Sequence, residues 1–225
     1  MTTPVQDLRG TPPVTDAAAE LARYSRVLYE RGWMPGTSGN LSVRQAGGLR
    51  DTALITPSGR DKGELTRDDM VTVHAETGEP RIHGPLRASA ETCIHAAVYR
   101  TTAAEAVIHV HSPYATVVAC RAGDPARRTT VPLTRFELLK GLGLADPAAT
   151  RVPVFPNWSD VPRIADDVAD WLRATPDAPP GLLIADHGIT AWGRDLAQAL
   201  ARLECFEAIC QLLVLGARSR EDHLP

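Results

Sequence analysis

The sequence lacks the features that mark most membrane, secreted and nucleic-acid-binding proteins. Its 225 residues contain no apolar run long enough to cross a bilayer, and the N-terminus has no charged start followed by an apolar stretch. Lysine and arginine number 24 against 27 acidic residues, a net charge of -3, with no basic cluster of the kind that binds nucleic acid. We therefore expect a cytoplasmic protein that engages neither a membrane nor a nucleic acid.

Cysteine is also scarce, with four in the chain and no C-x-x-C pair. Each lies in an apolar stretch that we expect to be helical, which indicates small core residues in a reducing compartment and no disulfide framework. They are Cys93, Cys120, Cys205 and Cys210.

The order of apolar patterns predicts a single α/β domain, because no internal repeat or low-complexity segment divides the chain. Short strands come early, and helices alternate with strands later. We expect an αβα sandwich with a mostly antiparallel central sheet flanked by helices. The domain should span residues 15–216, between a flexible arm at 1–14 and a C-terminal tail at 217–225, with the last helix ending near Gly216.

The stretch Ala106–Ser112 reads as a short buried strand that carries two histidines. Side chains alternate in a strand, so His109 and His111 share one face while Ile108 and Val110 take the other. Two imidazoles one pleat apart can reach the same ion. One core histidine plus one surface histidine is the alternative, and we favour the metal pair.

A third histidine stands where another apolar strand, beginning at Gly181, ends abruptly in polar residues. Ligands of α/β sheets gather at such strand ends, so His187 is placed like a third ligand. Three histidines without a cysteine suit a catalytic Zn²⁺ that keeps one position open, and the pattern leaves Fe²⁺ and Mn²⁺ possible.

Two loops rich in glycine, serine and threonine precede or follow the early strands, at Gly36–Ser42 and Thr56–Lys62. Glycine lets backbone amides approach a ligand, and the second loop adds Arg60 and Lys62, so together the loops suggest a phosphate site. Neither has the spacing of a Walker loop or a dinucleotide fingerprint, and either alone would be read as an ordinary turn.

A metal beside a phosphate site points to a small sugar phosphate, whose carbonyl and neighbouring hydroxyl a metal can polarise. Proton transfer then needs a carboxylate, and the candidates are Glu137 and Glu91. Each also has a plain structural explanation. Glu91 lies in the first turn of a predicted helix, where the helix dipole favours a carboxylate, and Glu137 can form a surface ion pair with Lys140.

Five motifs in this order resemble the class II aldolase/adducin family over residues 17–215, nearly the whole chain. They are Gly36-Thr-Ser-Gly-Asn-Leu-Ser42, Thr56-Pro-Ser-Gly59, Ser89-Ala-Glu91, His109-Val-His111 and Asp186-His-Gly188. The resemblance implies an αβα fold, one zinc ion per subunit held by His109, His111 and His187, and a homotetramer with active sites near subunit boundaries. It also implies that the two loops hold the substrate phosphate, through Thr37, Ser38, Gly39, Asn40, Ser58, Gly59 and Lys62.

Three further stretches resemble the dehydratases of that family that act on 5-methylthioribulose 1-phosphate in methionine salvage. They are Phe136-Glu-Leu-Leu-Lys-Gly141, Val152-Pro-Val-Phe-Pro-Asn157 and His187-Gly-Ile-Thr-Ala-Trp-Gly-Arg-Asp195. This resemblance implies loss of water to give 2,3-diketo-5-methylthiopentyl 1-phosphate, with Glu137 as the acid/base.

One departure keeps a second enzyme class open. Glu91 stands where the animal branch of these dehydratases has a cysteine, and it resembles the carboxylate that aldolases use next to the metal. The alternative is therefore a sugar-phosphate aldolase of the L-fuculose-phosphate type, or an epimerase or decarboxylase. Against the aldolase, the tail after Gly216 lacks the tyrosine that such aldolases use. A non-catalytic adducin-like head or a structural zinc domain is disfavoured, because all three histidines are present.

Overall fold

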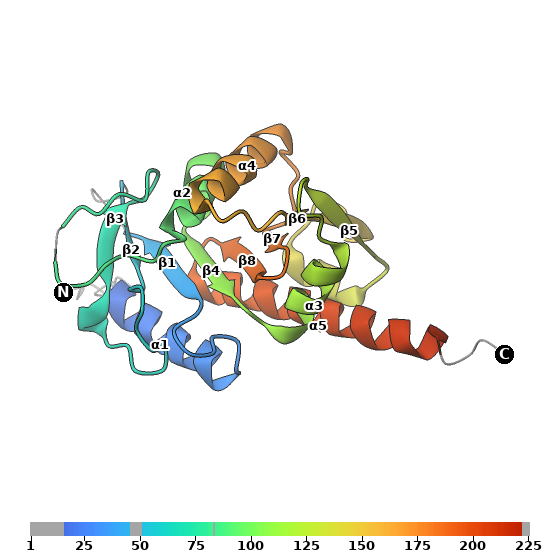
Figure 1. Cartoon of the computed structure of the whole chain (residues 1–225), viewed down its shortest axis with the longest axis horizontal. Helices are drawn as coiled ribbons and strands as arrows, with labels where there is room; N and C mark the ends of the chain where they lie inside the picture. Colours follow the sequence, from blue (N-terminus) through green and yellow to red (C-terminus); the bar gives the residue numbers. More distant parts are fainter. Residues whose placement is uncertain (1–15, 46–50, 83, 222–225) are drawn as a thin grey trace, which may run out of the picture.

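A single eight-stranded sheet runs through the molecule in the order β3-β2-β1-β4-β8-β7-β6-β5 (Figure 1). The computed structural model describes residues 16–45, 51–82 and 84–221. Every pairing is antiparallel except β6 with β7, which confirms the predicted mostly antiparallel sheet. The strands are β1 (Asn40–Arg44), β2 (Thr52–Ile55), β3 (Val71–His74), β4 (Ala106–Val110), β5 (Thr129–Thr134), β6 (Ala149–Phe155), β7 (Gly181–Ile184) and β8 (Gly188–Gly193).

Helices cover both faces of this sheet and complete the predicted αβα arrangement (Figure 1). One face carries α1 (Ala17–Glu30), α3 (Pro113–Ala122) and the long α5 (Leu196–Glu221). The other carries α2 (Thr92–Thr101) and α4 (Val161–Ala174). Two 3-10 helices, η2 (Arg67–Asp69) and η3 (Glu137–Leu142), lie in the connections.

Strand β4 sits in the middle of the sheet and is buried along its whole length. Ile108 and Val110 join the core beneath α1, α3 and α5, while Val107 joins the core under α2 and α4. Burying such side chains stabilises the fold by roughly 1.5–3 kcal/mol each, so the strand has one favourable register. The alternation predicted from sequence is therefore present, and it directs His109 toward the face of α2.

The element boundaries differ from expectation in two places. Helix α5 runs to Glu221, past the end expected near Gly216. Strand β5 is not among the elements expected from the sequence. It contains Pro132, which is tolerated because β5 is the last strand of the sheet and pairs with a neighbour on one side only. The predicted arm at 1–14 lies outside the described residues, as does 222–225 of the tail.

Within the part of the chain that the structure describes, no helix combines the length and the apolar character needed to cross a membrane. All four cysteines are free thiols.

Candidate active site

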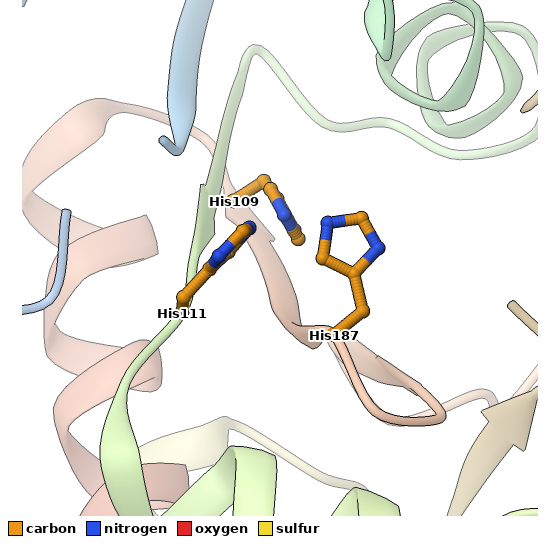
Figure 2. A group of neighbouring side chains, drawn as sticks. All are labelled: His109, His111 and His187. Carbon is orange, nitrogen blue, oxygen red and sulfur yellow. The ribbon is translucent and has the colours of Figure 1, made fainter. Parts of the chain in front are cut away.

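Three histidines from two separate segments converge at one end of the central strands (Figure 2). His109 and His111 come from β4 and its C-terminal end, and His187 comes from the turn between β7 and β8. Their ring centroids are 4.6–5.1 Å apart, and one nitrogen of each ring lies within 4.8 Å of the others. Three potential ligand nitrogens are thus close enough together to approach a single metal ion.

The pairing of β4 with β8 explains how His187 reaches the other two. The register places Val110 opposite Ile189, so the turn before β8 lies beside the end of β4. Asp186 takes a left-handed conformation in this turn, with φ 54°. Gly188 then passes so close to the Val110 carbonyl oxygen that a Cβ there would overlap it. Glycine at this position therefore lets the His187 turn close against the histidine strand.

Hydrogen bonding selects which nitrogen His109 offers. Its Nδ1 lies 3.0 Å from the Thr190 hydroxyl, which leaves Nε2 buried with no hydrogen-bond partner. Nδ1 of His187 is likewise buried and unpartnered. Unsatisfied buried nitrogens are costly in a folded protein, and coordination to a metal at the triad would satisfy Nε2 of His109.

The protonation state of these rings also suits a metal. Burial, opposed in part by the Glu91 carboxylate, lowers the pKa of His109 to about 4. Burial also lowers the pKa of His111, and the nearby charge of His187 acts in the same direction. Neutral imidazole is the form that ligates metals, so near neutral pH His109 and His111 can bind an ion without first losing a proton. The donor set therefore fits a divalent cation.

Glu91 is the carboxylate that the fold brings to this cluster. It stands directly before α2, and its oxygens lie 2.9 Å from Nε2 of His187 and 3.5 Å from Nε2 of His109. The Asn40 amide donates to it at 2.6 Å. Burial opposes its ionisation, but the charges of the imidazoles and the hydrogen bonds outweigh burial, so the pKa of Glu91 lies well below its ordinary value. An ionised carboxylate thus adjoins the histidines.

The first glycine-rich loop lies directly against the triad. Asn40 pairs with His109 in the sheet, and a Cβ on Gly39 would come within 3.0 Å of the His109 carbonyl oxygen. Gly39 also has φ +74°, a conformation that other residues rarely adopt. The loop therefore reaches the triad because glycine permits both the turn and the close approach.

Lys62 is a buried residue that contacts both glycine-rich loops. Its side chain is 1% exposed, and its ammonium donates to the Thr37 carbonyl at 2.8 Å and the Arg60 carbonyl at 2.9 Å. Burial lowers the pKa of Lys62, with the charges of Asp61 and Glu91 opposing that shift. This lysine therefore links the first loop to the second by hydrogen bonds. Its direct contact with a phosphate stays a prediction.

The other predicted phosphate contacts lie on the outer parts of the loops. Thr37, Ser58 and Gly59 are exposed, and the Ser38 hydroxyl donates to the Pro35 carbonyl at 2.7 Å. Their binding to phosphate also stays a prediction.

Glu137 stands apart from the histidines in the single chain. It begins η3, its side chain is 82% exposed, and its carboxylate accepts a hydrogen bond from Lys140 at 2.7 Å. Among the described residues, no hydrogen bond or ion pair joins Glu137 to the triad. Its proposed role in proton transfer therefore stays a prediction that the fold of one chain does not explain.

Sequence reasoning did not identify several supporting residues. Thr190, which orients His109, lies opposite it across the β4–β8 pair, and only knowledge of that pairing could have indicated it. Glu207 on α5 hydrogen-bonds the start of α3 just after the histidine strand, and no local motif marks it.

Comparison with known proteins identifies the family. The model of the class II aldolase and adducin N-terminal domain matches residues 19–214. This chain therefore belongs to the class II aldolase and adducin family, as its motifs indicated.

Its relatives include methylthioribulose-1-phosphate dehydratases. The one from Sorangium cellulosum is 41% identical over 216 residues, covering 93% of this chain and 98% of that protein. A probable bifunctional methylthioribose-1-phosphate isomerase/methylthioribulose-1-phosphate dehydratase from Nocardia farcinica is 52% identical over 203 residues. The match covers 90% of this chain but 36% of the Nocardia protein, so this chain spans about a third of that relative.

Solved structures agree on the fold. An L-fuculose 1-phosphate aldolase superimposes with a TM-score of 0.73 at 27% identity, covering 91% of this chain and 87% of the aldolase. The L-fuculose-1-phosphate aldolase from Thermus thermophilus gives a TM-score of 0.65 at 26% identity, covering 91% and 95%. The sandwich predicted from the sequence is thus the fold of this family.

Proposed function

We propose that this protein is a zinc-dependent dehydratase of 5-methylthioribulose 1-phosphate that serves methionine salvage. The observation that carries the proposal is the histidine triad, held in a chain that matches a methylthioribulose-1-phosphate dehydratase over almost the full length of both. Three histidines and no cysteine suit a catalytic ion with an open position better than a structural one. The four free cysteines fit the reducing cytoplasm.

Two groups of residues have separate roles in the proposed reaction. His109, His111 and His187 would hold the zinc ion, which supplies Lewis-acid polarisation of a carbonyl and the adjacent hydroxyl. The two loops tied by Lys62 would bind the phosphate, because they adjoin the triad and offer backbone amides.

Dehydration removes the proton on C3 and the hydroxyl on C4. The Glu137 carboxylate would accept the C3 proton or deliver a proton to the departing hydroxyl. The enol left between C3 and C4 becomes the 2,3-diketone when a proton returns to C4.

Glu137 needs a neighbouring subunit for this role. Its side chain is 82% exposed and pairs with Lys140, and among the described residues no hydrogen bond or ion pair joins it to the triad of its own chain. A homotetramer with sites at subunit boundaries, as the family resemblance implies, would bring it to a triad on another copy.

The second candidate is a class II sugar-phosphate aldolase, favoured by one observation. Glu91 lies beside two of the three histidines, where it resembles the carboxylate that aldolases use next to the metal. In that case Glu91, rather than Glu137, would handle the proton.

A turnover assay of the zinc-loaded protein with 5-methylthioribulose 1-phosphate, followed by mass spectrometry, tests the proposal. The expected product is lighter by one water, with its carbon chain intact. Cleavage of L-fuculose 1-phosphate or ribulose phosphates without any water loss would instead establish the aldolase.

A further inference from the structure

A buried carboxylate on α5 faces the start of α3, directly after the histidine strand. Glu207 is 6% exposed, and it accepts three hydrogen bonds. The donors are the Ser112 hydroxyl at 2.7 Å, the Tyr114 amide at 2.9 Å and the Ala115 amide at 2.8 Å. A buried charge of this kind is costly unless its partners are in place, so the arrangement restrains both helices.

The start of α3 needs an acceptor from elsewhere. Amides in the first turn of a helix have no partner within the helix, and a serine before the helix usually supplies one. Here Ser112 makes no such cap and donates its hydroxyl to Glu207 instead. Glu207 therefore takes over the capping function from a distant part of the chain, and its negative charge complements the positive end of the helix.

This capping contact is linked to two of the three proposed ligands, His111 and His187. Ser112 follows His111 directly, so fixing Ser112 fixes the end of the strand that presents His111. One turn into α3, the Thr116 hydroxyl donates to the Ser112 carbonyl at 2.8 Å and lies 3.3 Å from the His187 carbonyl oxygen. The start of α3 thus contacts the His111 strand and the His187 turn together.

We propose that Glu207 is a positioning residue of the metal centre, which sets the spacing of His111 and His187 through the start of α3. The proposal rests on the proposed function only in that the triad holds zinc. Glu207 touches no ligand side chain, so its effect would pass through the backbone it anchors. Residues that orient metal ligands from outside the coordination shell typically change metal affinity by about 10- to 100-fold.

The test is the zinc dissociation constant of the full-length protein, measured by competition with a chromophoric chelator. Glu207→Gln keeps the size of the side chain but replaces one acceptor oxygen with an NH₂ group that faces donors. We expect zinc binding to weaken about tenfold or more. Glu204→Gln is the matched control, because it removes the same charge one turn away, where the side chain is 42% exposed and pairs with Arg31. Its zinc affinity should stay within about twofold of the wild type.

Circular dichroism at the assay temperature must show that each variant is folded. If Glu207→Gln does not fold, Ser112→Ala, which removes one of the three donors, should weaken zinc binding in the same direction. A folded Glu207→Gln protein with lower thermal stability and unchanged zinc affinity would overturn the proposal. Glu207 would then stabilise the fold without affecting the metal ligands. Failure of the wild type to bind zinc would instead count against the proposed function.

Discussion

At the scale of single residues, the chemistry depends on which of two carboxylates moves the proton. We expect Glu137→Gln to lower turnover by roughly 10²- to 10⁴-fold, the usual contribution of general acid/base catalysis. Bound zinc should be unchanged, because Glu137 is not one of the three proposed zinc ligands. Steady-state kinetics with metal analysis of the same samples would measure both.

Lys140→Gln is the control for this prediction. It removes the hydrogen-bond partner of Glu137 in an exposed ion pair of the kind that contributes little to stability. If turnover falls as far in Lys140→Gln as in Glu137→Gln, the loss results from breaking the ion pair and not from removing a catalytic carboxylate. Turnover of Glu137→Gln within about tenfold of the wild type would move the catalytic role to Glu91.

A second prediction at this scale concerns His95, which is buried beneath the site. Its Nδ1 lies 2.7 Å from the Ser42 hydroxyl, which is also 2.7 Å from the Tyr99 hydroxyl. Burial, reinforced by the charge of His109 and opposed by Glu91, lowers the pKa of His95 to about 3. The folded protein therefore keeps this ring neutral where the unfolded chain would protonate it.

The sign of the pH effect follows from that difference. Between the unfolded pKa of about 6.5 and the folded pKa of about 3, the unfolded state binds one more proton, so acid destabilises the fold. The contribution of His95 is complete above pH 6.5 and falls by about 1.4 kcal/mol per pH unit below it. Urea unfolding between pH 7 and pH 4 should thus show a weaker loss of stability in His95→Gln than in the wild type. Parallel curves for the two proteins would contradict the prediction.

At the scale of elements, the sequence indicates local structure better than the contacts between distant segments. Alternation in Ala106–Val110 predicts a strand whose histidines share a face, because side-chain direction in a strand is fixed by the backbone. No local pattern tells that Glu91, at the start of α2, meets His187, because that contact depends on how α2 packs on the sheet. The strand with Pro132 is missed for a similar reason, since its position at the sheet edge is a property of the whole sheet.

The β7–β8 turn gives the prediction at this scale. A Cβ added at Gly188 would overlap the Val110 carbonyl oxygen, which is backbone and has little room to move. Gly188→Ala should destabilise the fold by roughly 1–3 kcal/mol or more and weaken zinc binding by displacing His187. Gly216→Ala is the control, because a Cβ there meets nothing within 4 Å. Thermal unfolding and zinc titration would compare the two variants. If Gly188→Ala unfolds at the same temperature and binds zinc as tightly as Gly216→Ala, Gly188 does not approach the Val110 carbonyl as closely as the structure shows.

At the scale of the whole molecule, the surface around α5 is where we predict that copies of the chain associate. Helix α5 projects beyond the body of the molecule (Figure 1). Large apolar side chains are exposed on it and on the two elements packed beside it, namely Leu212 and Leu215 on α5, Val117 on α3 and Leu138 on η3. Exposed apolar groups of this kind are typical of protein interfaces. Leu138 is next to Glu137, so an interface here would also bury the proposed acid/base.

This arrangement predicts complementation between two inactive variants. A Glu137→Gln subunit retains the triad and lacks the acid/base, whereas a His111→Ala subunit lacks a ligand but retains Glu137. If Glu137 serves the triad of a neighbouring copy, mixed oligomers contain some complete sites, and random mixing in equal amounts should restore about a quarter of wild-type turnover. Native mass spectrometry would verify that subunits have exchanged. Exchange without recovered activity would show that Glu137 does not act across the subunit boundary, and the exposed position of its side chain in one chain would then argue against any catalytic role for it.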